Sequence, residues 1–261
     1  MLSKLLKHEF KATARLMLPL YLVLCVLTIV DRIALSIEFK GALNVIPVFA
    51  TFAYGLSIVA IAVVSFVIIV LRFYKNLMTD EGYLMFTLPT KSHQLINSKL
   101  LVSFVWNIAS ILVIILSIFG VMATPDRMDL FRDGYQMFIS ELKQEFGAFN
   151  MSLFLFEFIV LMIVGLINNI LIIYVSIAVG QLFNGHKVLG SFAAYIGIGT
   201  VIQIVMTVLF ITLGVLFNKS FSESSSVPQI IFPITIGFLL LTNVLYYWGT
   251  DFIFKRKLNL E

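Results

Sequence analysis

The chain has 261 residues, of which 60% are hydrophobic and only 12% are charged, and its mean hydropathy is +1.03. Soluble domains carry about 25% charged residues, so this chain has too few polar side chains to cover a water-facing surface. The single cysteine, Cys25, excludes a disulfide framework. The composition therefore excludes a soluble domain and indicates an integral membrane protein.

Six segments are apolar and long enough to cross a bilayer, which requires about 20 residues per helix. The first is the weakest, because its uncharged run ends at Val30, just before Asp31 and Arg32. A signal peptide would also combine a basic start with a short apolar run, but no small-residue cleavage site directly follows Val30. We expect an all-α protein with one membrane domain over residues 1–261. Its predicted spans are residues 16–37, 45–71, 100–123, 151–183, 188–217 and 230–254.

Lysine and arginine are unevenly divided between the two sides of these spans. The N-terminus, the second and fourth connections and the C-terminal tail together hold 12 of the 18 basic residues. Cytoplasmic connections are the ones enriched in lysine and arginine, so both termini are predicted to lie in the cytoplasm. The basic net charge of +4 is thus a signal of membrane orientation and gives no indication of a nucleic-acid partner.

Residues 1–15 precede the first span and have two different faces. Leu2, Leu5, Leu6 and Phe10 recur at helical spacing, and Lys4, Lys7, His8 and Lys11 occupy the remaining face. This pattern predicts an amphipathic helix in the headgroup layer, with Lys4, Lys7 and Lys11 directed toward anionic lipid. The alternative is a basic flank that only sets the orientation of the first span.

The second connection, residues 72–99, is the most informative stretch of the chain. Thr79 or Asp80 can cap a short helix, Pro89 ends it, and Ser92 can cap a second helix that leads into the third span. The short helix carries an apolar cluster of Tyr83, Leu84, Met85, Phe86 and Leu88. An exposed apolar cluster usually meets another surface, so this segment is predicted to dock on a partner. A re-entrant turn packed on the membrane is the alternative.

The connection formed by residues 124–150 is the longest one predicted on the outer side. Its aromatic and leucine residues recur every three to four positions, from Phe131 to Phe146, which predicts one or two amphipathic helices. Two roles fit this pattern, a structural cap and a lid over a substrate path.

Few strongly polar residues lie inside the spans. Glu157 is an ionisable residue within the fourth span, and such a residue is by default a functional-site hypothesis, although at its depth it can also reach the interface or an amide. Asn168 and Asn169 lie at mid-span, where amides either bond across helices or line a substrate path. Gly190 and Ala194 are spaced for close helix packing.

The sequence lacks the motifs of common catalytic sites. It contains no G-x-x-x-x-G-K-[ST] phosphate loop and no H-E-x-x-H zinc helix, and its three histidines, His8, His93 and His186, are far apart in the sequence. We therefore expect that the chain is not an enzyme and carries neither a cofactor nor a metal.

The second connection resembles that of the permease subunits of bacterial ATP-binding-cassette exporters that handle drugs, antimicrobial peptides and surface polymers. Those permeases tend to show an acidic residue, a short apolar run ending in Leu-Pro, and a lysine where the next span starts. The corresponding residues here are Asp80-Glu81-Gly82, Leu84 to Leu88-Pro89, and Lys99. The opening Lys4-x-x-Lys7-x-Glu9-Phe10-Lys11 is also similar to the interfacial helix with which these permeases begin.

The resemblance implies a multi-pass protein of the bacterial plasma membrane. It implies pairing with a second permease, as a homodimer or with a paralogue, and docking on a separate P-loop ATPase that binds ATP and Mg²⁺. The coupling residues it implies are Asp80, Glu81, Tyr83, Leu84, Phe86, Leu88 and Pro89, and Lys99 would anchor the third span at the headgroups.

The expected function is export of an amphipathic or lipid-like substrate, such as an antimicrobial peptide or a drug. Two alternatives come from other classes of protein. One is a non-transporting membrane scaffold or sensor, and the other is an ion-coupled secondary transporter, which would use ionisable groups in broken helices at the midplane.

Overall fold

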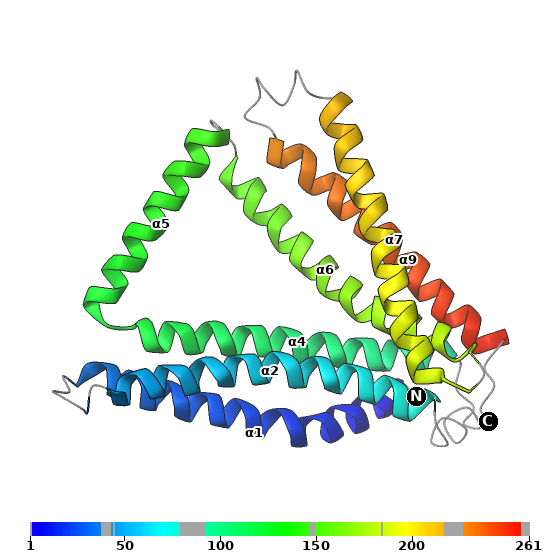
Figure 1. Ribbon diagram of the computed structural model, residues 1–261, viewed down its shortest axis with the longest axis horizontal. Helices are drawn as coiled ribbons and strands as arrows, with labels where there is room; N and C mark the ends of the chain where they lie inside the picture. The colour runs from blue at the N-terminus through cyan, green and yellow to red at the C-terminus, as the bar shows by residue number, and fades with distance from the viewer. Residues whose placement is uncertain are drawn as a thin grey trace. The chain divides into compact units, whose positions relative to one another are not determined.

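The computed structural model describes residues 2–37, 43, 45–78, 92–146, 150–183, 185–216 and 227–256 (Figure 1). Within these residues the regular structure consists of seven α-helices, with no strand. They are α1 (Leu2–Ser36), α2 (Val45–Met78), α4 (Ser92–Met122), α5 (Pro125–Phe146), α6 (Met151–Gly180), α7 (Lys187–Leu216) and α9 (Val227–Arg256).

Six of these helices are long and apolar enough to cross a membrane, in agreement with the number of spans predicted from the sequence. Several helices extend beyond the apolar runs, because the helical hydrogen-bond pattern does not require an apolar surrounding. Helix α2 continues past Leu71 to Met78, and α4 begins at Ser92, the residue predicted to cap it.

Helix α1 joins two elements that the sequence pattern separates. It runs without interruption from Leu2 to Ser36, with Pro19 inside it, so residues 2–15 do not form a helix distinct from the first span. At 1.5 Å per residue, its 35 residues extend about 52 Å, which exceeds the roughly 30 Å hydrocarbon core of a bilayer. Part of α1 must therefore project beyond that core if the helix crosses it.

A single helix, α5, occupies most of the connection between the third and fourth spans. It covers Pro125–Phe146, where the sequence predicts one or two amphipathic helices. Phe131 contacts Phe119 of α4 with a centroid distance of 5.8 Å. Tyr135 and Phe138, further along the same helix, are exposed.

The chain divides into two compact units. Unit 1 comprises residues 1–72 and 97–134, and unit 2 comprises residues 73–96 and 135–261. In unit 1, α1, α2 and α4 pack around a core that includes Met17, Leu24 and Ile61. Contacts between α1 and α4 advance in the same direction along both helices, while α2 runs opposite to them.

Unit 2 contains α6, α7 and α9, together with the last residues of α2, the first residues of α4 and the second half of α5. Helices α6 and α9 run parallel, since Phe154 contacts Phe232 near their starts and Asn168 bonds Thr242 further along. Phe73, at the end of α2, stacks on Tyr174 of α6 with a centroid distance of 3.8 Å. Within each unit the helix directions alternate along the chain, as consecutive membrane spans require.

The turn between α6 and α7 depends on two glycines. Gly185 has a φ of +91°, a backbone conformation that side chains with a Cβ rarely adopt. Gly180 lies so close to α7 that an added Cβ would approach the Cα of Ser191 to 2.6 Å. The predicted close packing at Gly190 lies in the same region, because its added Cβ would meet Phe183 at 2.8 Å.

Candidate functional site

The buried face of α1 in unit 1 is lined by polar side chains. Glu9, Thr13, Tyr21 and Asp31 are all buried there, and Thr28 is partly buried on the same face. They follow one another at intervals of three, four, seven or eight residues, so they fall on one stripe of the helix. We call this face the polar seam; it packs against α2 and α4.

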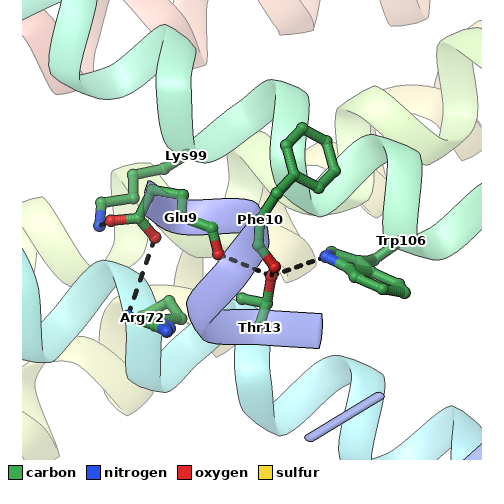
Figure 2. Close-up of polar contacts among 6 residues, drawn as sticks. All are labelled: Glu9, Phe10, Thr13, Arg72, Lys99 and Trp106. Carbon is green, nitrogen blue, oxygen red and sulfur yellow. Dashed lines mark hydrogen bonds and ion pairs between the residues drawn. The ribbon is translucent and has the colours of Figure 1, made fainter. Parts of the chain in front are cut away.

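The charged end of the seam consists of three side chains, one from each helix (Figure 2). Oε1 of Glu9 forms an ion pair with Nζ of Lys99, and Oε2 of Glu9 lies 3.9 Å from Nη1 of Arg72. The side chain of Lys99 is 3% exposed and that of Arg72 is 26% exposed. Burial of the Glu9 carboxylate is tolerated because two cations compensate its charge.

Thr13 continues the seam one turn further along α1. Its Oγ1 accepts a hydrogen bond from Nε1 of Trp106 at 2.7 Å and donates to the carbonyl oxygen of Glu9 at 2.8 Å (Figure 2). A cavity of about 10 Å³ is lined in part by Glu9, Arg72, Lys99 and Thr13. It has roughly the volume that one water molecule needs.

Neutral hydroxyl groups form the middle of the seam. The hydroxyl of Tyr21 shares a 2.7 Å hydrogen bond with Ser110 of α4, whose Oγ lies 3.1 Å from Oγ of Ser65 on α2. Thr28 shares a 2.7 Å bond with Ser117, which also bonds the hydroxyl of Tyr54 at 2.9 Å. Each of these two layers connects all three helices.

The far end of the seam is a buried carboxylate with a neutral partner. Asp31 is 1% exposed, and its Oδ1 accepts a hydrogen bond from Thr51 of α2 at 2.8 Å. The two buried carboxylates of α1 thus differ in surroundings, because Glu9 faces two cations and Asp31 faces a hydroxyl.

Apolar side chains lie between the polar layers of the seam, and they limit what the seam can do chemically. Leu24 and Ile61 are buried in the core among the layers and carry no polar atom on their side chains. Among the described residues, the side-chain hydrogen bonds therefore do not form a continuous path from Glu9 to Asp31. What the seam can do is fix the register of α1 against α2 and α4, as interhelical polar contacts do in membranes.

The predicted coupling residues lie outside the described part of the chain. They are Asp80, Glu81, Tyr83, Leu84, Phe86, Leu88 and Pro89.

The lysines predicted at the membrane interface fall into two groups. Lys4, Lys7 and Lys11 are exposed on α1, where they are able to reach lipid headgroups. Lys99 is buried and paired with Glu9. Because a headgroup anchor needs an exposed ammonium, this geometry favours an ion pair within unit 1 over a lipid contact.

The polar residues predicted inside the fourth span have different surroundings. Asn168 donates to Oγ1 of Thr242 at 2.8 Å and to Oδ1 of Asn243 at 2.9 Å, so it links α6 to α9. Its neighbour Asn169 is exposed. Oε2 of Glu157 is buried without a hydrogen-bond partner among the described residues.

Sequence analysis missed the roles of Glu9, Arg72 and Asp31, because each was assigned to a flank or an end of a span. The spacing of the polar residues on α4 is a signal that could have found this polar face. On α4, Lys99, Trp106, Ser110 and Ser117 recur at intervals of four or seven residues, and such polar spacing within an apolar helix indicates a packed polar face.

Comparison with known proteins does not identify the chain: no protein-family model, curated protein or solved structure matches it.

Proposed function

We propose that this chain is the membrane-spanning permease subunit of an ATP-binding-cassette transporter. The observation that carries the proposal is the connection between α2 and α4, in which an apolar cluster follows an acidic pair and ends at Leu88-Pro89. This connection belongs to the side of the molecule that holds 12 of the 18 basic residues, the side predicted to be cytoplasmic.

The helices on both sides of this connection support the proposal. Helix α2 remains helical to Met78 and α4 is helical from Ser92. Only residues 79–91 separate two membrane-length helices, so a partner bound there would act directly on two spans.

The proposed docking contact uses two kinds of side chain. Tyr83, Phe86 and Leu88 are the apolar anchors, since aromatic residues in buried pockets contribute most to interface affinity. Asp80 and Glu81 provide charge complementarity, which affects partner choice and association rate more than affinity. The partner would be a P-loop ATPase carrying ATP and Mg²⁺, because this sequence has no phosphate loop.

The transport path in this proposal runs along the interface with a second permease, either an identical copy or a paralogue. The chain contains 25 phenylalanines and its spans are largely apolar, so an amphipathic or lipid-like cargo fits it better than a small ion or a sugar. An antimicrobial peptide or a drug exported across the bacterial plasma membrane is the cargo class that we propose.

Co-purification tests this proposal. The tagged chain is isolated in mild detergent from its native host, and bound proteins are identified by mass spectrometry for the wild type, Phe86→Asp and Phe138→Asp. Phe138 is the matched control, because it is an exposed phenylalanine of α5 in a different connection. We expect a P-loop ATPase with the wild type and Phe138→Asp, and its loss with Phe86→Asp.

The other outcomes discriminate between the functions. If an ATPase binds equally to all three variants, the permease proposal stands and the docking site lies elsewhere in the chain. If no ATPase is recovered even after crosslinking, the permease proposal is wrong and the scaffold and secondary-transporter alternatives replace it.

A further inference from the structure

We infer that Glu9 is a positioning residue that joins α1 to α2 and α4, the two helices that flank the docking segment, defined here as residues 79–91. Movement of that segment would then be passed to α1 through the ion cluster of Glu9, Arg72 and Lys99. The inference rests on the proposed function, because it assumes that a partner moves the segment.

The position of the cluster along the helices is the first argument. Arg72 lies six residues before Met78, the last residue of α2, and Lys99 lies seven residues after Ser92, the first residue of α4. At 1.5 Å per residue, each cation lies about 10 Å along its own helix from Met78 or Ser92. The Glu9 carboxylate contacts both of them, so one side chain of α1 is joined to both helices that carry the segment.

The kind of interaction is the second argument. Further along the seam, α1 is joined to α2 and α4 by neutral hydroxyl groups, as at Tyr21 and Thr28. Among the residues of α1, α2 and α4 that the structure describes, the ion cluster lies at the end of the seam next to the docking segment. A buried ion pair that loses one partner leaves an uncompensated charge, so the cluster resists separation of α1 from α2 and α4 more strongly than a hydroxyl contact does.

The adjacent residue of α2 gives a third argument. Arg72 contacts Glu9 within unit 1, while Phe73 stacks on Tyr174 of α6 within unit 2. Consecutive residues at this end of α2 are therefore held by different spans. A displacement of the segment reaches α6 through an aromatic stack and α1 through the ion cluster.

A label beside Glu9 makes the inference testable. Replacing Cys25 with serine removes the only cysteine of the chain, and His8→Cys then places a nitroxide on an exposed position of α1 next to Glu9. The complex with its co-purified ATPase is reconstituted in lipid nanodiscs. The nitroxide spectrum is recorded without nucleotide and with Mg-ATP and vanadate, for the unsubstituted chain, Glu9→Gln and Asp31→Asn.

Asp31→Asn is the matched control, because it also removes a buried carboxylate from α1 but lies away from the docking segment. We expect a nucleotide-dependent spectral change in the unsubstituted chain and in Asp31→Asn. In Glu9→Gln the bound ATPase still hydrolyses ATP, but most of the nucleotide-dependent spectral change is lost.

A full spectral change in Glu9→Gln, with the ATPase bound, would overturn the inference and leave the permease proposal intact. Absence of any ATPase from the wild-type complex would defeat both. If Glu9→Gln does not accumulate in the membrane, the double variant Glu9→Gln/Lys99→Gln replaces it, because it leaves no unpaired ammonium in the core. A full spectral change in the double variant would equally overturn the inference.

Discussion

At the scale of single residues, we expect substitutions in the ion cluster of Glu9 to have the largest effect on the free energy of unfolding. Lys99→Met removes the nearer of the two described cations from the buried Glu9 carboxylate and leaves Arg72 at 3.9 Å. Breaking a buried pair in this way typically costs about 3–5 kcal/mol, and the remaining cation should hold the loss toward the lower end of that range. The measurement is unfolding in detergent as a function of denaturant.

A double-mutant cycle separates the pair from its surroundings. Glu9→Leu/Lys99→Met should lose clearly less than the sum of its single variants, since neither charge is left alone. Lys255→Met is the control, because Lys255 pairs with Asp251 on α9 while 55% exposed; exposed pairs four residues apart contribute about 0.3–0.5 kcal/mol. Additive losses at Glu9 and Lys99 would show that the two side chains do not interact.

Two adjacent amides on α6 give a second prediction at this scale. Asn168→Leu removes hydrogen bonds to Thr242 and Asn243, and interhelical bonds of this kind contribute about 0.6 kcal/mol on average and up to about 1.7. Asn169→Leu removes an exposed amide of the same size. This second substitution should leave the free energy of unfolding unchanged or increase that free energy. Equal losses in the two variants would place Asn169 in an interface with another chain.

At the scale of helices, the crossing of α6 and α7 depends on the absence of one side chain. A Cβ on Gly180 would approach the Cα of Ser191 to 2.6 Å, and backbone there cannot move aside as a flexible side chain would. We expect Gly180→Ala to destabilise unit 2 by about 1–3 kcal/mol, the usual cost of overpacking. Gly197→Ala is its control, since nothing lies within 4 Å of the added Cβ. Similar melting temperatures for the two alanine variants would contradict this account of the crossing.

The helices also show which features of the fold can be predicted from sequence patterns and which cannot. Six spans were predictable because long apolar runs have few alternatives in a bilayer. The continuity of α1 was not predictable, since the composition changes from charged to apolar near Leu16 but this change does not interrupt backbone hydrogen bonding. The ion cluster was not predictable either, because Arg72 and Lys99 lie 63 and 90 residues from Glu9 in sequence and only the packing of three helices brings them together.

At the scale of the whole molecule, the distribution of basic residues predicts the orientation. In a chain with Cys25 replaced by serine, a single cysteine that replaces Ser3 or His186 should react with an impermeant thiol reagent only after the membrane is opened. A cysteine at Arg132 of α5 should react in intact cells, because it lies on the side with fewer basic residues. Labelling of Ser3→Cys in intact cells would contradict the predicted orientation.

The central claim is that the docking segment binds a P-loop ATPase, and photo-crosslinking at one of its residues tests this most directly. A photoreactive amino acid replaces Phe86 in one strain and Phe138 of α5 in another, and crosslinked proteins are identified by mass spectrometry. Our account predicts a P-loop ATPase attached at position 86 and none at position 138. Crosslinks from position 86 to lipid or to this chain alone would contradict it.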